Sequence, residues 1–245
     1  DPIAVADSKR LYGSGRGLDR LARAVAAFRL AGASGETRVL GSPYWGALSP
    51  DSAPAAEPAS ARLRERLRDL GIRPRFLGAI LLSEDEFNAR LARLHSKGVV
   101  LSEAGAAFIA QALGPATEGR FLFDRQGGRK DYAGFLLRAF PGTMWRRAAA
   151  RGEDPDARIV YRSGAGAAEF IVKGDALELP IALASMAAKL ARERAMERLN
   201  AFWASRVPGL SPTAGYPEDA RRFLRQIDRA RAAAGLSMES VRRVK

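Results

Sequence analysis

The stretch FIVKGDALELPIALASMAAKLARERAMERL, residues 170–199, joins an apolar strand to a long helical segment through an abrupt polar turn. The apolar run is followed at once by Lys, Gly and Asp175, which predicts a strand that ends on a carboxylate. Pro180 suits the first turn of a helix, which we expect over residues 180–203. Apolar residues recur there at three- and four-residue spacing and predict one buried stripe: Ile181, Ala184, Ala188, Ala191, Ala195, Leu199 and Phe202.

A second strand also stops at an aspartate. RFLFDRQGG predicts a short strand ending at Asp124, before a double glycine. In open α/β sheets the carboxyl ends of strands line the ligand crevice, so Asp124 and Asp175 are candidate site residues. With no cysteine in the chain and a single histidine, these carboxylates favour a hard divalent cation, Mg²⁺ or Mn²⁺. The alternative is that both aspartates are turn residues or helix caps.

The rest of the chain predicts alternating helices and strands. RFLGAILL at 75–82 is a buried strand candidate, and Ser83 with Glu86 matches a capping box, so the acids of SEDE are expected to cap a helix. Two helical segments are expected at about 84–95 and 102–113. RIVYRSGAGAAEFIVKGD predicts a hairpin, and a turn followed by an amphipathic helix is expected in the tail.

Charge and composition restrict the classes of partner. The chain has 40 Lys and Arg against 27 Asp and Glu, a formal charge of +13, which favours polyanions and makes nucleic acid the first candidate. A general preference for Arg in the composition is the alternative. The absence of cysteine excludes disulfides and thiolate sites and fits a reducing cytoplasm. No apolar stretch approaches the roughly 20 residues that cross a bilayer, so no membrane association is expected.

Four segments, in chain order, resemble the ribonuclease HII (type 2 ribonuclease H) family. VADSKRL at 5–11 is similar to its Asp-Ser-Lys-Lys-Leu segment, FN at 87–88 takes the place of its Ile-Asn, and FLFD at 121–124 is similar to its third catalytic strand. KGDALELPIALASMAAKLARERAMERL, followed by PTAGYP, resembles its C-terminal half. The resemblance implies the ribonuclease H-like α/β fold over 1–207, a mixed sheet with helices on both faces, and a helical C-terminal extension packed on it over 208–245.

The resemblance also implies roles for individual residues. Asp124 and Asp175 match the third and fourth carboxylates of the family's Asp-Glu-Asp-Asp metal site. Ser8 and Lys9 would lie near the substrate backbone. His95 matches no motif and is expected at the surface.

Further matched residues follow in the C-terminal half. Ser185, Lys189 and Arg192 share one helical face by their spacing, and would bind phosphate or brace the site. A solvated charged face is the alternative. Tyr216 would read the ribonucleotide at its junction with DNA; a tyrosine packed at a turn is the alternative for this residue.

The chain departs from the family at its start. The family's Asp-Glu-Ala-Gly-Arg-Gly strand supplies the first two carboxylates, and no such segment occurs in the 245 residues. Since the sequence begins at Asp1, we expect a native product extended upstream by at least about 20 residues, with the first β-hairpin absent from this chain. The Pro/Ala-rich stretch 41–61, expected as a surface excursion, and the insertion 131–157 exceed a minimal member.

The function that the resemblance implies is metal-dependent cleavage of RNA in RNA–DNA hybrids, including ribonucleotides embedded in DNA. A monomer is expected. The alternatives are a catalytically incomplete nucleic-acid-binding protein of the ribonuclease H-like fold, or another nuclease of that superfamily.

Overall fold

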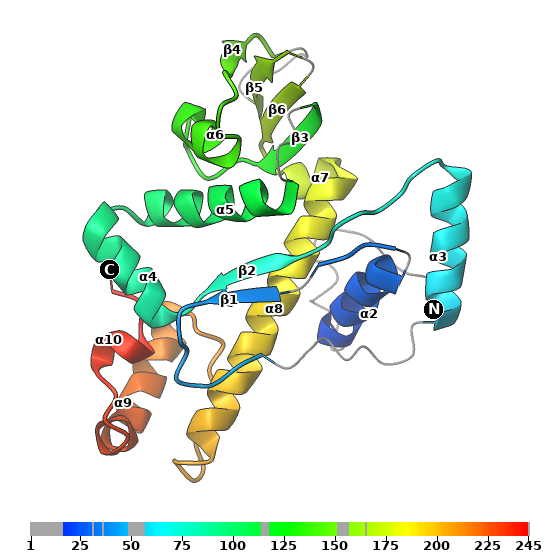
Figure 1. Ribbon diagram of the computed structural model, residues 1–245. Helices are drawn as coiled ribbons and strands as arrows, with labels where there is room; N and C mark the ends of the chain where they lie inside the picture. The colour runs from blue at the N-terminus through cyan, green and yellow to red at the C-terminus, as the bar shows by residue number, and fades with distance from the viewer. Residues whose placement is uncertain are drawn as a thin grey trace.

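The computed structural model describes residues 17–30, 32–35, 37–48, 57–113, 118–150, 157–164 and 166–244. Within these ranges the protein is α/β, with a two-stranded sheet, a four-stranded sheet and helices around them (Figure 1). None of the helices in these ranges is long and apolar enough to cross a bilayer.

The four-stranded sheet is mixed, and Asp124 is the last residue of one of its strands. The strand predicted to end on Asp175 instead stops at Ile171, and Asp175 lies in the short helix that follows. Its order is β3 (Gly119–Asp124), β6 (Gly166–Ile171), β5 (Arg158–Ser163) and β4 (Arg146–Ala148). The predicted end of a strand at Asp124 is confirmed, and so is the hairpin, since β5 and β6 pair antiparallel. β3 pairs with β6 in parallel, so the carboxyl ends of these two strands adjoin.

Aromatic packing on one face holds this sheet against α6 (Ala133–Ala139), which lies beside it in Figure 1. Phe170 of the fully buried strand β6 stacks on Tyr132, with ring centroids 3.7 Å apart, and on Phe123 at 4.8 Å. Such pairs add to area burial and favour one packing arrangement. Within the predicted insertion 131–157, the sequence pattern indicates the helix but not the short strand β4 that follows it.

The second sheet pairs β1 (Thr37–Leu40) with β2 (Ala79–Leu82) in parallel. The strand predicted over 75–82 is therefore shorter at its start, where Phe76 makes only an isolated bridge to Ser34. Within the described part of the 41–61 stretch, Trp45 is buried and packs into the core beside Trp203. Burial of the Trp45 side chain therefore holds this proline-rich segment against the protein core.

The long helix α8 (Leu179–Ala204) runs from the four-stranded sheet past β1 and β2 toward the C-terminal helices (Figure 1). The predicted helix is confirmed, but the predicted stripe is partly wrong, because Ala184 and Ala188 are exposed. The buried residues instead form separate groups. Met186 and Leu190 join the cluster around α2 (Gly17–Leu30), whereas Leu199 and Trp203 join a C-terminal cluster. A helix with different partners along its length buries different sides of its surface.

The helices α4 (Glu84–Leu94) and α5 (Lys97–Leu113) follow β2. Ser83 is the N-cap of α4, but the predicted capping box does not form, since its side chain makes no capping bond to the helix. The Ser83 backbone N–H, which Glu86 would accept in such a box, donates to the Leu40 carbonyl at 3.0 Å, and Glu86 pairs with Arg90 instead. The predicted start at 102 is also wrong, since α5 begins at Lys97. His95 is exposed at the end of α4 with φ of 53°, which agrees with the predicted surface position.

The remaining helices are α3 (Glu57–Asp69), α7 (Gly174–Leu177), α9 (Pro217–Ala233) and α10 (Met238–Val241). The turn and amphipathic helix predicted for the tail are confirmed by α9, which buries Phe223 and Ile227 against the end of α8. The C-terminal helices thus complete a hydrophobic cluster around Trp203, which is fully buried.

Candidate functional site

Asp124 and Asp175 lie at the same edge of the four-stranded sheet. Asp124 is the last residue of β3, and Asp175 follows the adjacent strand β6 in the short helix α7. The backbone N–H of Gly174 donates to Oδ1 of Asp124 at 2.9 Å, which links the two strand ends directly. Asp124 is exposed and Asp175 is half-buried, so both carboxylates are accessible from solvent. The structure therefore brings this predicted pair together.

The turn between them depends on a lysine and a glycine. Lys173 adopts a left-handed conformation, with φ of 53° and ψ of 40°, an uncommon geometry for a residue with a side chain. At Gly174 a Cβ would lie 2.6 Å from Cδ1 of Ile181 and 3.4 Å from Oδ1 of Asp124. A side chain at this position would therefore displace the end of the buried Ile181 side chain, whereas its distance from the Asp124 carboxylate would be an ordinary contact.

An ion-pair network fixes the strands beneath this edge to the start of α8. Glu169 on β6 accepts from Nε of Arg120 on β3 at 2.8 Å and also pairs with Arg158 on β5. Arg158 Nη2 lies 3.2 Å from Glu178, the N-cap residue of α8. The hydrogen bond from Arg120, followed by that from Arg158, holds the pKa of Glu169 below its ordinary value against the effect of burial.

The predicted basic face of α8 contains an acid. Glu193 Oε1 lies 3.1 Å from Nζ of Lys189 and 2.6 Å from Nη1 of Arg192. Arg192 also donates from Nη2 to the carbonyl of Ala214 at 2.6 Å, which ties α8 to the turn before α9. Ser185 is half-buried on the same helix. This geometry gives Arg192 a bracing contact in addition to any role with phosphate.

Tyr216 is the N-cap residue of α9 and is 61% exposed. The guanidinium carbon of Arg192 lies 5.5 Å from the centre of its ring, within the range of a cation–π contact. Asp219 orders this turn by accepting from the Thr213 hydroxyl at 2.6 Å and the Ala214 N–H at 2.8 Å. Hydrogen bonds from Thr213, then from Arg222 and then from the Ala214 N–H lower the pKa of Asp219 to about 2. Arg192 and Tyr216, which the sequence predicts separately as substrate contacts, therefore lie against each other.

The two pairs lie at different levels of α8. At 1.5 Å per residue, the rise along the helix from Leu179, just after Asp175, to Arg192 is about 20 Å. Ser8 and Lys9 lie outside the described residues. Within the part of the chain that the structure describes, no group of three or more His, Asp or Glu side chains is arranged to hold a metal ion.

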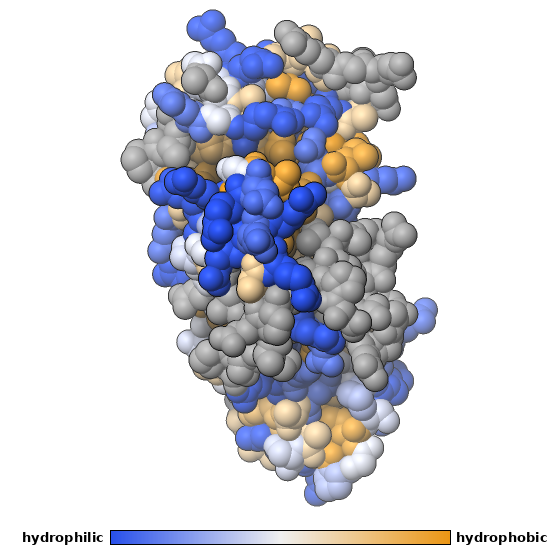
Figure 2. Space-filling view, turned by 90° about the vertical axis from the view of Figure 1, so that its right-hand side faces the viewer, coloured by the Kyte–Doolittle hydropathy of each residue, from blue (hydrophilic) through white to orange (hydrophobic). Residues whose placement is uncertain are grey.

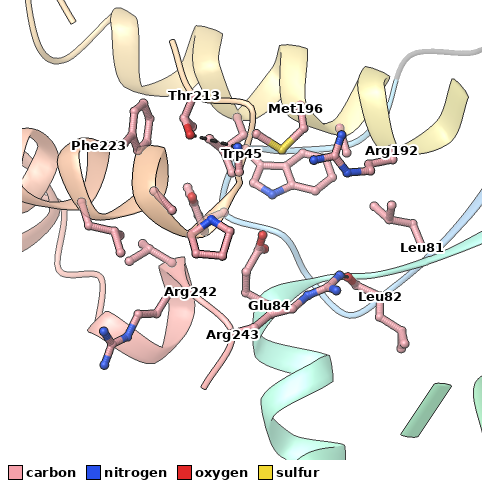
Figure 3. Close-up of a pocket in the computed structure, with 18 of the residues that line it drawn as sticks. Trp45, Leu81, Leu82, Glu84, Arg192, Met196, Thr213, Phe223, Arg242 and Arg243 are labelled. Carbon is pink, nitrogen blue, oxygen red and sulfur yellow. Dashed lines mark hydrogen bonds between the residues drawn. The ribbon is translucent and has the colours of Figure 1, made fainter. Parts of the chain in front are cut away.

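A feature that the sequence patterns miss is a pocket of about 840 Å³ beside the middle of α8 (Figure 3). Trp45, Glu84, Met196 and Arg243 are among its lining residues. The sequence assigns Glu84 to helix capping, and nothing local to it indicates a pocket, because the other walls come from distant segments. The one available signal is an isolated tryptophan in the proline-rich stretch.

Comparisons of the chain with protein-family models, with curated proteins and with solved structures give no match. Two features of the molecule therefore bear on its function: the aspartates at the sheet edge and the Arg192–Tyr216 contact on α8.

Proposed function

We propose that this protein is a metal-dependent endonuclease of the ribonuclease H-like fold, which cleaves RNA in RNA–DNA hybrids, including ribonucleotides embedded in DNA. The observation that supports it is the position of Asp124 at the carboxyl end of β3 and of Asp175 shortly after the end of the parallel strand β6, with the Gly174 N–H bonded to Asp124. Carboxylates at such strand ends face the crevice in which α/β sheets bind ligands.

The chemistry of these side chains suits a hard cation. Asp124 and Asp175 would hold Mg²⁺ or Mn²⁺, since carboxylate oxygens are the ligands that these ions prefer. A bound ion of this kind supplies an activated water and stabilises charge on the phosphate oxygens. Gly174 fixes Oδ1 of Asp124 and so orients the carboxylate, leaving Oδ2 for a ligand. The network of Glu169 and its arginines holds the strand ends at a constant separation.

Basic residues and an aromatic ring provide contacts for the substrate. Arg192 and Tyr216 offer a cation and an exposed ring, a combination suited to phosphate and sugar recognition. Exposed arginines also lie along α3, among them Arg62, Arg66 and Arg68. Hydrophilic side chains gather across the face shown in Figure 2, the side of the molecule on which α3 lies. A duplex contacting several of these groups would bind with a strong dependence on salt.

The test is substitution of each carboxylate by its amide. Asp124→Asn and Asp175→Asn should each lower hybrid cleavage at least about 100-fold, since even residues that only orient metal ligands contribute up to that factor. Hybrid binding should remain, because the phosphate contacts are unchanged. Asp228→Asn on the outer face of α9 is the matched control, since its carboxylate pairs with Arg231 and should not affect turnover. Near-normal turnover of either site variant in Mg²⁺ and Mn²⁺ would exclude the assignment.

A second function is favoured by one observation. Since the described ranges contain no third metal-ligating side chain beside the aspartate pair, the chain would also suit a protein that binds hybrids without cleaving them. The same assay separates the two functions. Salt-sensitive hybrid binding by the unmodified chain, with no product in either metal, would support the binding protein.

A further inference from the structure

The pocket beside α8 has the size and composition of a small-molecule site. It lies between α8, the start of α4, α9 and the C-terminal segment, and its volume of about 840 Å³ is within the range of ligand pockets. Trp45, Met196, Leu199 and Phe223 contribute apolar and aromatic walls. Walls of this kind accept a flat apolar ring system.

One polar group inside the pocket lacks a partner. Figure 3 shows the Glu84 side chain projecting from the start of α4 toward Trp45. Trp45 hydrogen-bonds to this carboxylate, but Oε2 is buried and, among the described residues, has no hydrogen-bond partner. Burial raises the pKa of Glu84, while the charge of Arg243 opposes the shift. A buried acceptor without a donor is unfavourable, and a ligand N–H would relieve it.

Cations surround the same pocket. Arg192, Arg221, Arg242 and Arg243 all line it, and the last three are exposed to solvent. Figure 3 shows Arg192, Arg242 and Arg243 on different sides of the pocket. A guanidinium group can bind two phosphate oxygens at once, so one of these arginines would suit an anionic group. A fatty acid would leave Oε2 of Glu84 without a donor, and a polyamine would be repelled by the arginines. The occupant therefore needs N–H donors for Glu84 and a negative charge that can reach one of the arginines.

We propose that this pocket binds a guanine nucleotide, with the base against the apolar wall, its N–H edge donating to Glu84, and its phosphate at one of the arginines. Guanine offers two adjacent donors, N1–H and the 2-amino group, to a carboxylate. Adenine and cytosine offer an amino group beside an acceptor. Uracil places a single N–H between two carbonyl groups, which a carboxylate repels. The ligand could be a free nucleotide or an unstacked guanine at the end of a strand, and the chemistry is the same in both cases.

The experiment measures the affinities of GMP, AMP, CMP and UMP by calorimetry, with tryptophan fluorescence as a second readout. GMP should bind most tightly, and UMP at least about tenfold more weakly, since one unsatisfied buried hydrogen-bonding group accounts for such a factor. Glu84→Gln should weaken GMP by a similar factor, about tenfold, and reduce the GMP-to-UMP ratio. Its melting temperature should stay the same or rise, because a buried charge is removed.

Two controls separate this site from the proposed nuclease site. Glu197→Gln alters an exposed glutamate that pairs with Arg194 outside the pocket, and should leave GMP affinity unchanged. Asp124→Asn should also leave it unchanged, so that failure of the nuclease proposal would not affect this result. Equal affinity for GMP and UMP, an unchanged affinity in Glu84→Gln, or no binding of any of the four nucleotides would overturn the inference.

A final comparison identifies the source of the guanine. If a thymidine oligomer ending in guanosine binds more tightly than GMP and is displaced by GMP, the pocket accepts a strand end. If GMP binds and the oligomer does not compete, the ligand is the free nucleotide. Both results support a guanine site.

Discussion

Glu169→Gln should test whether the ion-pair network stabilises the sheet edge that carries the aspartates. Glu169 is only 8% exposed and lies on the strand between the two that supply its arginines. Its carboxylate accepts from Nε and Nη2 of Arg120 at 2.8 and 3.3 Å and also pairs with Arg158. Glutamine keeps the shape and one acceptor oxygen but removes the charge.

The structure sets the size of the effect. Hydrogen bonds to charged groups contribute about 1.5–3 kcal/mol each, and loss of one partner of a fully buried pair costs about 3–5 kcal/mol. Here the side chains of Arg120 and Arg158 are 56% and 29% exposed and both also face Glu178, so neither is left as an isolated buried charge. We therefore expect the free energy of unfolding to fall by about 2 kcal/mol, which is closer to the contribution of one hydrogen bond to a charged group than to the loss of a buried ion pair. For a chain of this length that lowers the melting temperature by about 4–8 °C.

The pH dependence gives a second measurement. Because the folded-state pKa of Glu169 is lowered, its stabilising contribution is complete above the unfolded-state value of about 4.3 and is lost as pH falls through the folded-state pKa. The difference between wild type and Glu169→Gln, measured by urea unfolding, should therefore shrink in acid. Glu197→Gln, which alters an exposed pair, should change stability by less than about 0.5 kcal/mol. A Glu169→Gln effect equal to this control, or one that persists unchanged in acid, would refute the reasoning.

Two further substitutions test the turns that present the candidate residues. Gly174→Ala would place a methyl group 2.6 Å from Ile181, and should lower the free energy of unfolding by about 1–3 kcal/mol together with cleavage. Gly98→Ala on α5 should do neither, because its added methyl group would make only an ordinary contact of 3.9 Å with Ser96. Tyr216→Ala should reduce cleavage at a single ribonucleotide in DNA more than cleavage within a long RNA tract. The melting temperature should not change, because Tyr216 is 61% exposed. Equal losses on both substrates, with a lower melting temperature, would mean that Tyr216 has a structural role.

The elements with strong local signals could be predicted from the sequence. Helix α8, the β5–β6 hairpin and the end of β3 at Asp124 each have a clear boundary residue or periodicity. The sides of α8 that are buried could not be predicted. Alanine recurs all around this helix, so the pattern does not single out one face, and burial is decided by α2 and α9, which are distant in sequence. The division into two sheets likewise depends on pairing between distant strands.

The sequence predicts on which elements the candidate residues lie, but only some of their contacts. The spacing of Lys189 and Arg192 places both on one side of α8. Glu193 lies four residues after Lys189, and this spacing predicts the salt bridge between them. The role of Glu84 could not be read in this way. Trp45, Glu84 and Arg243 belong to three segments, and only the folded chain makes the burial of Oε2 evident.

Helix α8 separates the aspartates at the sheet edge from the Arg192–Tyr216 contact. Its first residues are tied to the sheet through Glu178 and Arg158, and its middle is tied to the Tyr216 turn through Arg192 and Ala214. The rise of about 20 Å between these attachments corresponds to about six nucleotides of one strand at 3.4 Å each. If Asp124 and Asp175 cleave, a sugar contacted by Tyr216 would therefore lie several nucleotides from the cleaved bond, and a single ribonucleotide would be recognised at a distance rather than at the cleaved junction itself. Selectivity for a ribonucleotide would then depend on the rigidity of α8 and its two attachments as well as on the tyrosine ring.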